Sequence, residues 1–131
     1  MGASLWRGAG AVSGLISVAA GAFGAHGLRG RLSPELLAAF ETGARYQMYH
    51  ALLLCVVGGL LLRAGAAATG TLSLCGGLLV AGTVLFSGSL YGLALTGQRS
   101  LGAITPLGGL CFLAAWAILA VAALRGTLTA G

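Results

Sequence analysis

Four long apolar runs, almost free of charged side chains, constrain the fold of this chain more than any other feature. They cover about residues 8–25, 46–62, 71–95 and 106–124. A helix needs about 20 mostly apolar residues to span the hydrocarbon core of a bilayer. Because lipid offers the backbone no hydrogen bonds, only helices or closed barrels span it, and runs this long exclude alternating barrel strands.

Composition also places the chain in a membrane rather than in water. Hydrophobic residues make up 58% of it and charged residues only 7%, whereas a soluble domain carries about 25% charged residues. All the basic residues are arginines that stand singly near the ends of the runs. The net charge of +5 therefore indicates anchors at lipid headgroups, and no nucleic-acid partner is expected.

We therefore predict an all-α fold, an integral membrane bundle of four transmembrane helices in a single domain over residues 1–131. The helices are expected over about residues 8–26, 34–62, 71–96 and 106–125. Ser33-Pro34-Glu35 is typical of a helix start, and Thr105-Pro106 repeats its first two elements. Because Pro34 precedes the second apolar run, we expect a short interfacial helix between the first two membrane helices. It either bends near Gly43 or continues into the membrane.

Up-and-down alternation of four helices assigns each polar residue to one side of the membrane. Side one holds both termini and the loop over residues 63–70, and side two holds residues 27–45 and 98–105. Most hydrogen-bonding side chains of the runs gather toward side two. They are His26, Tyr46, Gln47, His50, Ser87, Ser89, Tyr91 and Thr105.

The spacing of this cluster brings some of its members together. Tyr46, Gln47 and His50 are separated by three and four residues, so they share a helix face. His26, at the end of the first helix, is placed to approach His50 across the contact between the first two helices. We also expect an ion pair between Glu41 and Arg45, spaced i, i+4.

Two interpretations of the cluster stay open. In one, the aromatic residues form an interfacial belt and the polar side chains bond neighbouring helices. In the other, His26 and His50 line a polar pocket that binds a small molecule, ion or metal. Neither interpretation provides a nucleophile with its base, so we predict no catalytic residues. Two histidines with no carboxylate in the apolar runs do not complete a metal site, so the first interpretation predicts no metal and no cofactor. Cys55, Cys75 and Cys111 fall at different depths and are interpreted as small buried residues.

Small residues predict where the helices touch. Ser13, Ser17, Gly21 and Ala25 recur every four residues on the first helix, and Gly88 and Gly92 form a similar pair on the third. Such stripes let helix backbones approach closely, and packing of this kind holds helices together in lipid.

Several segments together resemble one known family. They are Gly21-Ala-Phe-Gly-Ala-His26, residues 42–50, residues 82–91 and Thr105-Pro-Leu-Gly-Gly109 followed by Trp116. The chain resembles the YgdD-like bacterial inner-membrane proteins, domain of unknown function 423, which are related to eukaryotic transmembrane protein 256. The resemblance implies a four-helix membrane protein and carries no activity. Basic C-terminal tails in that family imply that side one, with both termini, faces the cytoplasm.

The function expected from these observations is a non-enzymatic accessory or structural component of a membrane assembly in the bacterial inner membrane. The alternative is a small-molecule-, ion- or metal-binding membrane protein, or a small transporter, that uses the cluster around His26 and His50. The expected partners are membrane lipid and either further copies of the chain or a larger membrane complex.

Overall fold

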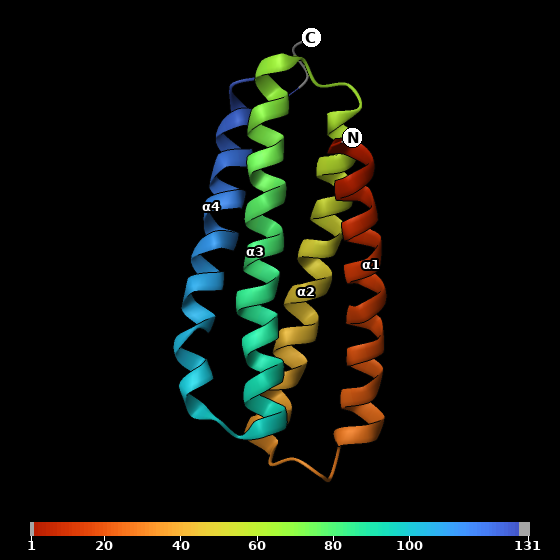
Figure 1. Ribbon diagram of the computed structural model, residues 1–131, viewed down its shortest axis with the longest axis vertical. Coiled ribbons are helices and arrows are strands. Elements are labelled where there is room, and N and C mark those ends of the chain that lie inside the picture. Colours follow the sequence, from red (N-terminus) through yellow and green to blue (C-terminus); the bar gives the residue numbers. More distant parts are fainter. Residues whose placement is uncertain (1, 129–131) are drawn as a thin grey trace.

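The chain folds into an elongated bundle of antiparallel helices, and the computed structural model describes residues Gly2–Leu128. In chain order the elements are α1 (Gly2–Phe23), the π-helical segment η1 (Gly24–Leu28), α2 (Pro34–Leu61), α3 (Ala66–Thr96), the 3-10 segment η2 (Arg99–Ala103) and α4 (Thr105–Leu124). Figure 1 shows the start of α1 and the end of α4 at the same end of the bundle. The described residues contain no strand, which confirms the all-α prediction.

Local sequence explains the beginning of α2 and the end of α3. Ser33 caps α2 as predicted, because its hydroxyl accepts a hydrogen bond from the amide of Leu36 at 3.3 Å. α3 ends at Gly97, whose φ of 72° lies in the left-handed region that glycine adopts without strain.

Three helix starts differ from the prediction. α1 begins at Gly2 rather than near residue 8. α3 begins at Ala66 rather than near residue 71, since the alanines after Gly65 strongly favour helix. The expected cap at Thr105 does not form, because Thr105 is already helical and makes no capping hydrogen bond. Its hydroxyl contacts Ser89 of α3 instead.

Of the two alternatives for the segment before the second apolar run, straight continuation is the one found, because Pro34–Leu61 is one continuous helix and no separate interfacial helix precedes it. Gly43, the expected bend, lies inside α2 against the ring of Tyr91. A Cβ atom there would lie 3.0 Å from Cε1 of that ring. Since no proline interrupts α2 beyond its first turn, Gly43 serves close packing and does not act as a hinge.

Three helical stretches are long and apolar enough to cross a membrane: Gly2–Leu28, Ala66–Thr96 and Arg99–Leu124. α2 falls outside this group because its first half carries Glu35, Glu41 and Arg45 together with polar side chains. It nevertheless runs alongside the other helices and lies between α1 and α3 (Figure 1).

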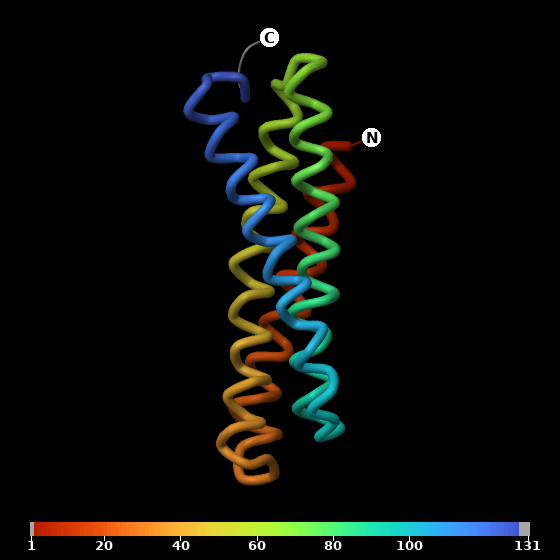
Figure 2. Tube along the Cα trace, turned by 90° about the vertical axis from the view of Figure 1, so that its left-hand side faces the viewer, coloured from red at the N-terminus to blue at the C-terminus, as the bar shows by residue number. Residues whose placement is uncertain are grey.

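The order of the helices in space follows their order in the chain. α2 packs against both α1 and α3, and α4 packs against α3. Figure 2 shows α4 running obliquely across the bundle, and both views show the start of α2 extending beyond the ends of α3 and α4. α1 therefore leaves much of its surface open: its buried residues are only Gly10 and Ser17.

Glycines set the closest helix approaches. A Cβ atom at Gly10 would lie 2.7 Å from the carbonyl oxygen of Ala51, so α1 and α2 meet there. Gly82 and Gly108 allow a similarly close approach between α3 and α4. A Cβ atom at Gly82 would meet the ring of Phe112, and one at Gly108 would meet the backbone of Phe86. The predicted contact at Gly88 is not found, because nothing lies within 4 Å of a Cβ atom there.

The main apolar core joins α2, α3 and α4. Leu54, Val57, Leu72 and Leu79 are almost completely buried within it. Cys75 lies in the same core, and its thiol is 3.8 Å from the carbonyl oxygen of Ala115.

Candidate functional site

Gln47 of α2 joins three helices through its side-chain amide. Its Nε2 donates to Ser13 Oγ of α1 at 3.2 Å, and its Oε1 accepts from the hydroxyl of Tyr91 of α3 at 2.7 Å. The side chain is 5% exposed. A buried amide that bonds at both ends holds its neighbours in a fixed register.

Two serines bind consecutive carbonyl groups of α2 from opposite sides. Ser17 of α1 donates to the carbonyl oxygen of Ala44 at 2.7 Å, and Ser87 of α3 donates to that of Gly43 at 2.7 Å. A carbonyl oxygen has two lone pairs, so it can accept a side-chain hydroxyl as well as its helical amide. Such bonds join helices where lipid offers no competing partner.

His50 forms a second polar contact, on the side of α2 that faces α4. Trp116 Nε1 donates to His50 Nε2 at 3.1 Å, and His50 Nδ1 lies 2.6 Å from the carbonyl oxygen of Tyr46. Because an indole N–H only donates, Nε2 must accept, so the ring proton resides on Nδ1 and the imidazole is neutral. The His50 ring also stacks on Phe112, with ring centroids 3.5 Å apart.

Ser89 and Thr105 connect the last part of α3 to the start of α4. Their hydroxyl oxygens lie 2.6 Å apart, and Ser89 also donates to the carbonyl oxygen of Phe86 at 2.9 Å. Since a serine hydroxyl has one proton, Thr105 is the donor between the two hydroxyls.

The predicted cluster is thus divided into separate contacts, and one of its residues stands apart. His26 is exposed at the side-two end of the first helix, while His50 is buried against α4. The two imidazoles are therefore not brought together. Within Gly2–Leu128, no group of three or more His, Cys, Asp or Glu side chains gathers where it could hold a metal ion.

An aromatic hollow lies beside His50 and opens outward between α2, α3 and α4. Its volume is about 430 Å³, and we name it by the rings that line it: Tyr46, Tyr49, His50, Phe86, Phe112 and Trp116. Tyr46 and Tyr49 are 39% and 50% exposed. Neither of their hydroxyls has a hydrogen-bond partner among the described residues, so both remain able to bond a ligand.

Sequence reasoning missed Phe112 and Trp116 as members of the site, and it assigned Ser13 and Ser17 only to a small-residue stripe. A signal for Trp116 exists: it carries the one indole N–H within the fourth apolar run, and a buried indole needs an acceptor. Nothing in the sequence pattern points to Phe112, because its role depends on the position of His50.

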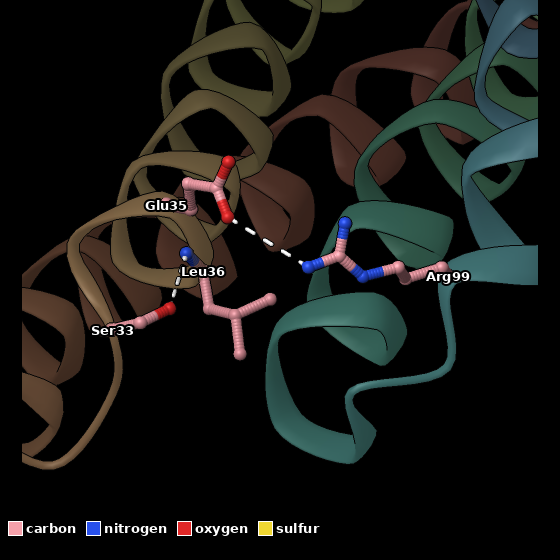
Figure 3. A network of polar contacts seen from close by, with 4 residues as sticks. All are labelled: Ser33, Glu35, Leu36 and Arg99. Atoms are coloured by element: carbon pink, nitrogen blue, oxygen red, sulfur yellow. Dashed lines mark hydrogen bonds and ion pairs between the residues drawn. The ribbon is translucent and has the colours of Figure 1, made fainter.

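The ion pair in the structure differs from the expected one. Glu35, in the first turn of α2, lies 3.8 Å from Arg99 of η2, and both side chains are strongly exposed. Figure 3 shows this contact beside the cap that Ser33 provides. The predicted pair between Glu41 and Arg45 does not form among the described residues, and an exposed pair such as Glu35–Arg99 contributes little to stability.

Comparison with known proteins identifies the family. The family model described as "Protein of unknown function (DUF423)" matches residues 20–109. The chain belongs to the DUF423 family. The match confirms the resemblance inferred from the sequence motifs, and it covers α2, α3 and most residues of the polar contacts.

Relatives of this DUF423 member are bacterial membrane proteins. UPF0382 membrane protein YwdK of Bacillus subtilis (strain 168) is 47% identical over 116 residues, which cover 88% of this chain and 93% of the relative. UPF0382 membrane protein SERP0230 of Staphylococcus epidermidis is 47% identical over 120 residues, covering 88% and 92%. No solved structure matches the chain. The membrane nature is therefore supported by both the relatives and the apolar helices.

Proposed function

We propose that this protein is a non-enzymatic component of a membrane assembly, with an accessory or structural role. One observation carries the proposal: the buried polar side chains of the cluster bind one another or helix backbones. Gln47, His50 and Ser87 each bond a neighbouring helix. Side chains engaged in this way fix the helices relative to one another, and they do not form an acid–base pair or an activated nucleophile.

We further propose that all four helices cross the bacterial inner membrane and that both termini face the cytoplasm. α2 extends for roughly 42 Å at about 1.5 Å per residue, longer than the hydrocarbon core of about 30 Å. Its polar groups Gln47 and His50 face other helices rather than lipid. A helix of this kind crosses a membrane despite its modest hydropathy.

The assembly is tested by cross-linking in intact membranes before purification of a tagged chain in mild detergent. We expect a species larger than the 12.9 kDa chain, with a further copy or another protein present in a fixed ratio. The same material dissolved in a denaturing detergent without cross-linking is the control and runs as the single chain. A single chain recovered from cross-linked membranes contradicts the proposal.

A second candidate function is the binding of a flat, lipid-soluble ring, and the aromatic hollow favours it. The rings of Tyr46 and Phe86, with centroids 5.0 Å apart, and those of His50 and Phe112 provide walls suited to stacking. The free hydroxyls of Tyr46 and Tyr49 supply donors for a carbonyl oxygen. These features match the head group of a quinone-type lipid, without implying any reaction on it.

Tryptophan fluorescence tests this candidate, because the chain has only two tryptophans and one lies in the hollow. In the Trp6→Phe variant, Trp116 is the sole reporter, and we expect menadione to quench it with saturation. Tyr46→Phe and Tyr49→Phe should weaken the effect while leaving the walls intact. The matched control is Trp116→Phe, in which Trp6 reports only collisional quenching. Quenching that is linear in both variants rules out a site.

A further inference from the structure

A groove with charged walls runs along the outer surface between α1 and α2. Ser17, Gly21 and Ala44 form its small-residue floor, and Glu41 and Arg45 flank it. Its volume is about 340 Å³. The small residues leave room for another helix to approach the backbones of α1 and α2 closely.

The charged walls lie alongside the first apolar helix, which is long enough to cross a membrane. The hydrogen bond from Ser17 to the carbonyl oxygen of Ala44 places these two residues at one level. Ser17 lies roughly 16 Å along the helix from Leu28, the end of the first apolar helix, at about 1.5 Å per residue. Arg45 follows Ala44, so its Cα atom lies alongside this apolar helix and not beyond its end, and Glu41 lies one turn nearer side two.

Neither charge has a partner in its own chain. Both side chains are exposed, and the one ion pair within Gly2–Leu128 joins Glu35 to Arg99. The chain contains only two acidic residues, so Glu41 is the one acid left for Arg45. Charged side chains in a membrane span are costly unless they pair or reach water.

We infer that this groove binds the same groove of a second copy of the chain, related by a two-fold axis. In such an isologous contact every interaction occurs twice. If Glu41 of one copy touches Arg45 of the other, then Arg45 of the first copy touches Glu41 of the other. Because both copies have the same orientation, the axis runs along the membrane normal, and Glu41 of each copy lies one helix turn in depth from Arg45 of the other. These long side chains pair diagonally across the axis, and two ion pairs form at once. The inference rests on the proposed function, since it names the partner through which the protein associates.

The charge complementarity decides in favour of a second copy over another occupant. A single acid and a single base, one turn apart on one helix face, offer two reciprocal diagonal ion pairs across a two-fold axis. An anionic lipid headgroup would satisfy Arg45 but leave Glu41 facing a second negative charge. α1 leaves its side of the groove open to such a partner, because Gly10 and Ser17 are its only buried residues.

Charge reversal tests the inference with two differently tagged copies of the full chain expressed in one membrane. We expect Glu41→Arg alone, or Arg45→Glu alone, to lower co-purification of the two tags by about tenfold or more, since like charges in an interface oppose association strongly. Co-expression of one copy with Glu41→Arg and the other with Arg45→Glu should restore it, because every facing pair is again opposite. Glu35→Arg is the matched control and should change nothing.

Recovery in the mixed pair also shows that both variants fold. A chain that carries both Glu41→Arg and Arg45→Glu exchanges the two charges within one copy. If copies of this double variant associate with each other but the mixed pair does not, the two charges pair within one chain and the inference is overturned. Unchanged co-purification in all single variants overturns it too, while the proposed role in an assembly stands. If unsubstituted copies do not associate and the cross-linked membranes yield a lone chain, both proposals fail.

Discussion

At the scale of single residues, the polar side chains of this bundle act as cross-links between helices. Gln47 bonds α1 and α3 together, and the His50–Trp116 contact is the polar link between α2 and α4. Interhelical hydrogen bonds in membranes contribute about 0.6 kcal/mol each on average. The positions of these hydrogen bonds matter as much as their energy, because each bond fixes the rotation of α2 relative to one neighbouring helix.

The Gln47 contact gives a residue-scale prediction. Gln47→Leu removes two hydrogen bonds and leaves the Tyr91 hydroxyl without its partner, so we expect the free energy of unfolding to fall by about 1–2 kcal/mol. Tyr91→Phe should cost less, and the double variant should cost less than the two single changes together. Reversible unfolding in mixed detergent micelles measures all three. Strictly additive losses would show that the two side chains do not interact.

The same residues show why the sequence predicted the cluster but not its partition. Spacing places Gln47 and His50 on one face, but side chains three residues apart still differ by about 60° around the helix. Two side chains that differ by this angle face different neighbouring helices, so Gln47 contacts α1 and α3 while His50 contacts α4. Which neighbour each side chain meets depends on how α2 is rotated and on the oblique path of α4 (Figure 2). Neither is encoded in local spacing.

At the scale of elements, the order and approximate positions of the helices followed from the apolar runs, although α1 and α3 begin earlier than predicted. The sites of helix contact did not follow from the sequence pattern alone. Gly88 belongs to the predicted pair of small residues and Gly108 does not, yet Gly108 lies against the backbone of Phe86 while Gly88 faces open space. The pattern records which helix faces are small. The contact requires that a partner helix passes over that face.

These two glycines give an element-scale prediction with its own control. A Cβ atom at Gly108 would lie 2.8 Å from Cα of Phe86, a backbone atom that cannot move alone. Gly108→Ala should therefore separate α3 from α4 and lower the free energy of unfolding by about 1–3 kcal/mol. Gly88→Ala meets nothing and should be neutral or slightly stabilising, because alanine favours helix. Thermal unfolding in one detergent compares the two, and equal effects would contradict the packing described.

At the scale of the whole molecule, α2 decides the topology. Gln47 and His50 are turned toward α1, α3 and α4, so the hydropathy of α2 is lowered by residues that bond other helices as well as by the exposed Glu35, Glu41 and Arg45. Hydropathy averages all faces of a helix, whereas lipid meets only the outer one. This is why α2 is absent from the three helices that length and composition select.

Reporter fusions test the topology directly. With four crossings, reporters at the N-terminus, after Arg63 and at the C-terminus share one side, which we propose is the cytoplasm, and a reporter after Gln98 lies opposite. A fluorescent protein that matures only in the cytoplasm and an alkaline phosphatase active only outside it should give reciprocal signals. If α2 does not cross, the two termini report opposite sides.

The bond between Trp116 and His50 has a consequence for proton movement. A histidine relays protons when one ring nitrogen can accept while the other releases. Here the indole N–H occupies Nε2 and the carbonyl oxygen of Tyr46 holds the proton on Nδ1. The imidazole of His50 therefore cannot relay a proton as long as Trp116 of α4 stays in contact with it.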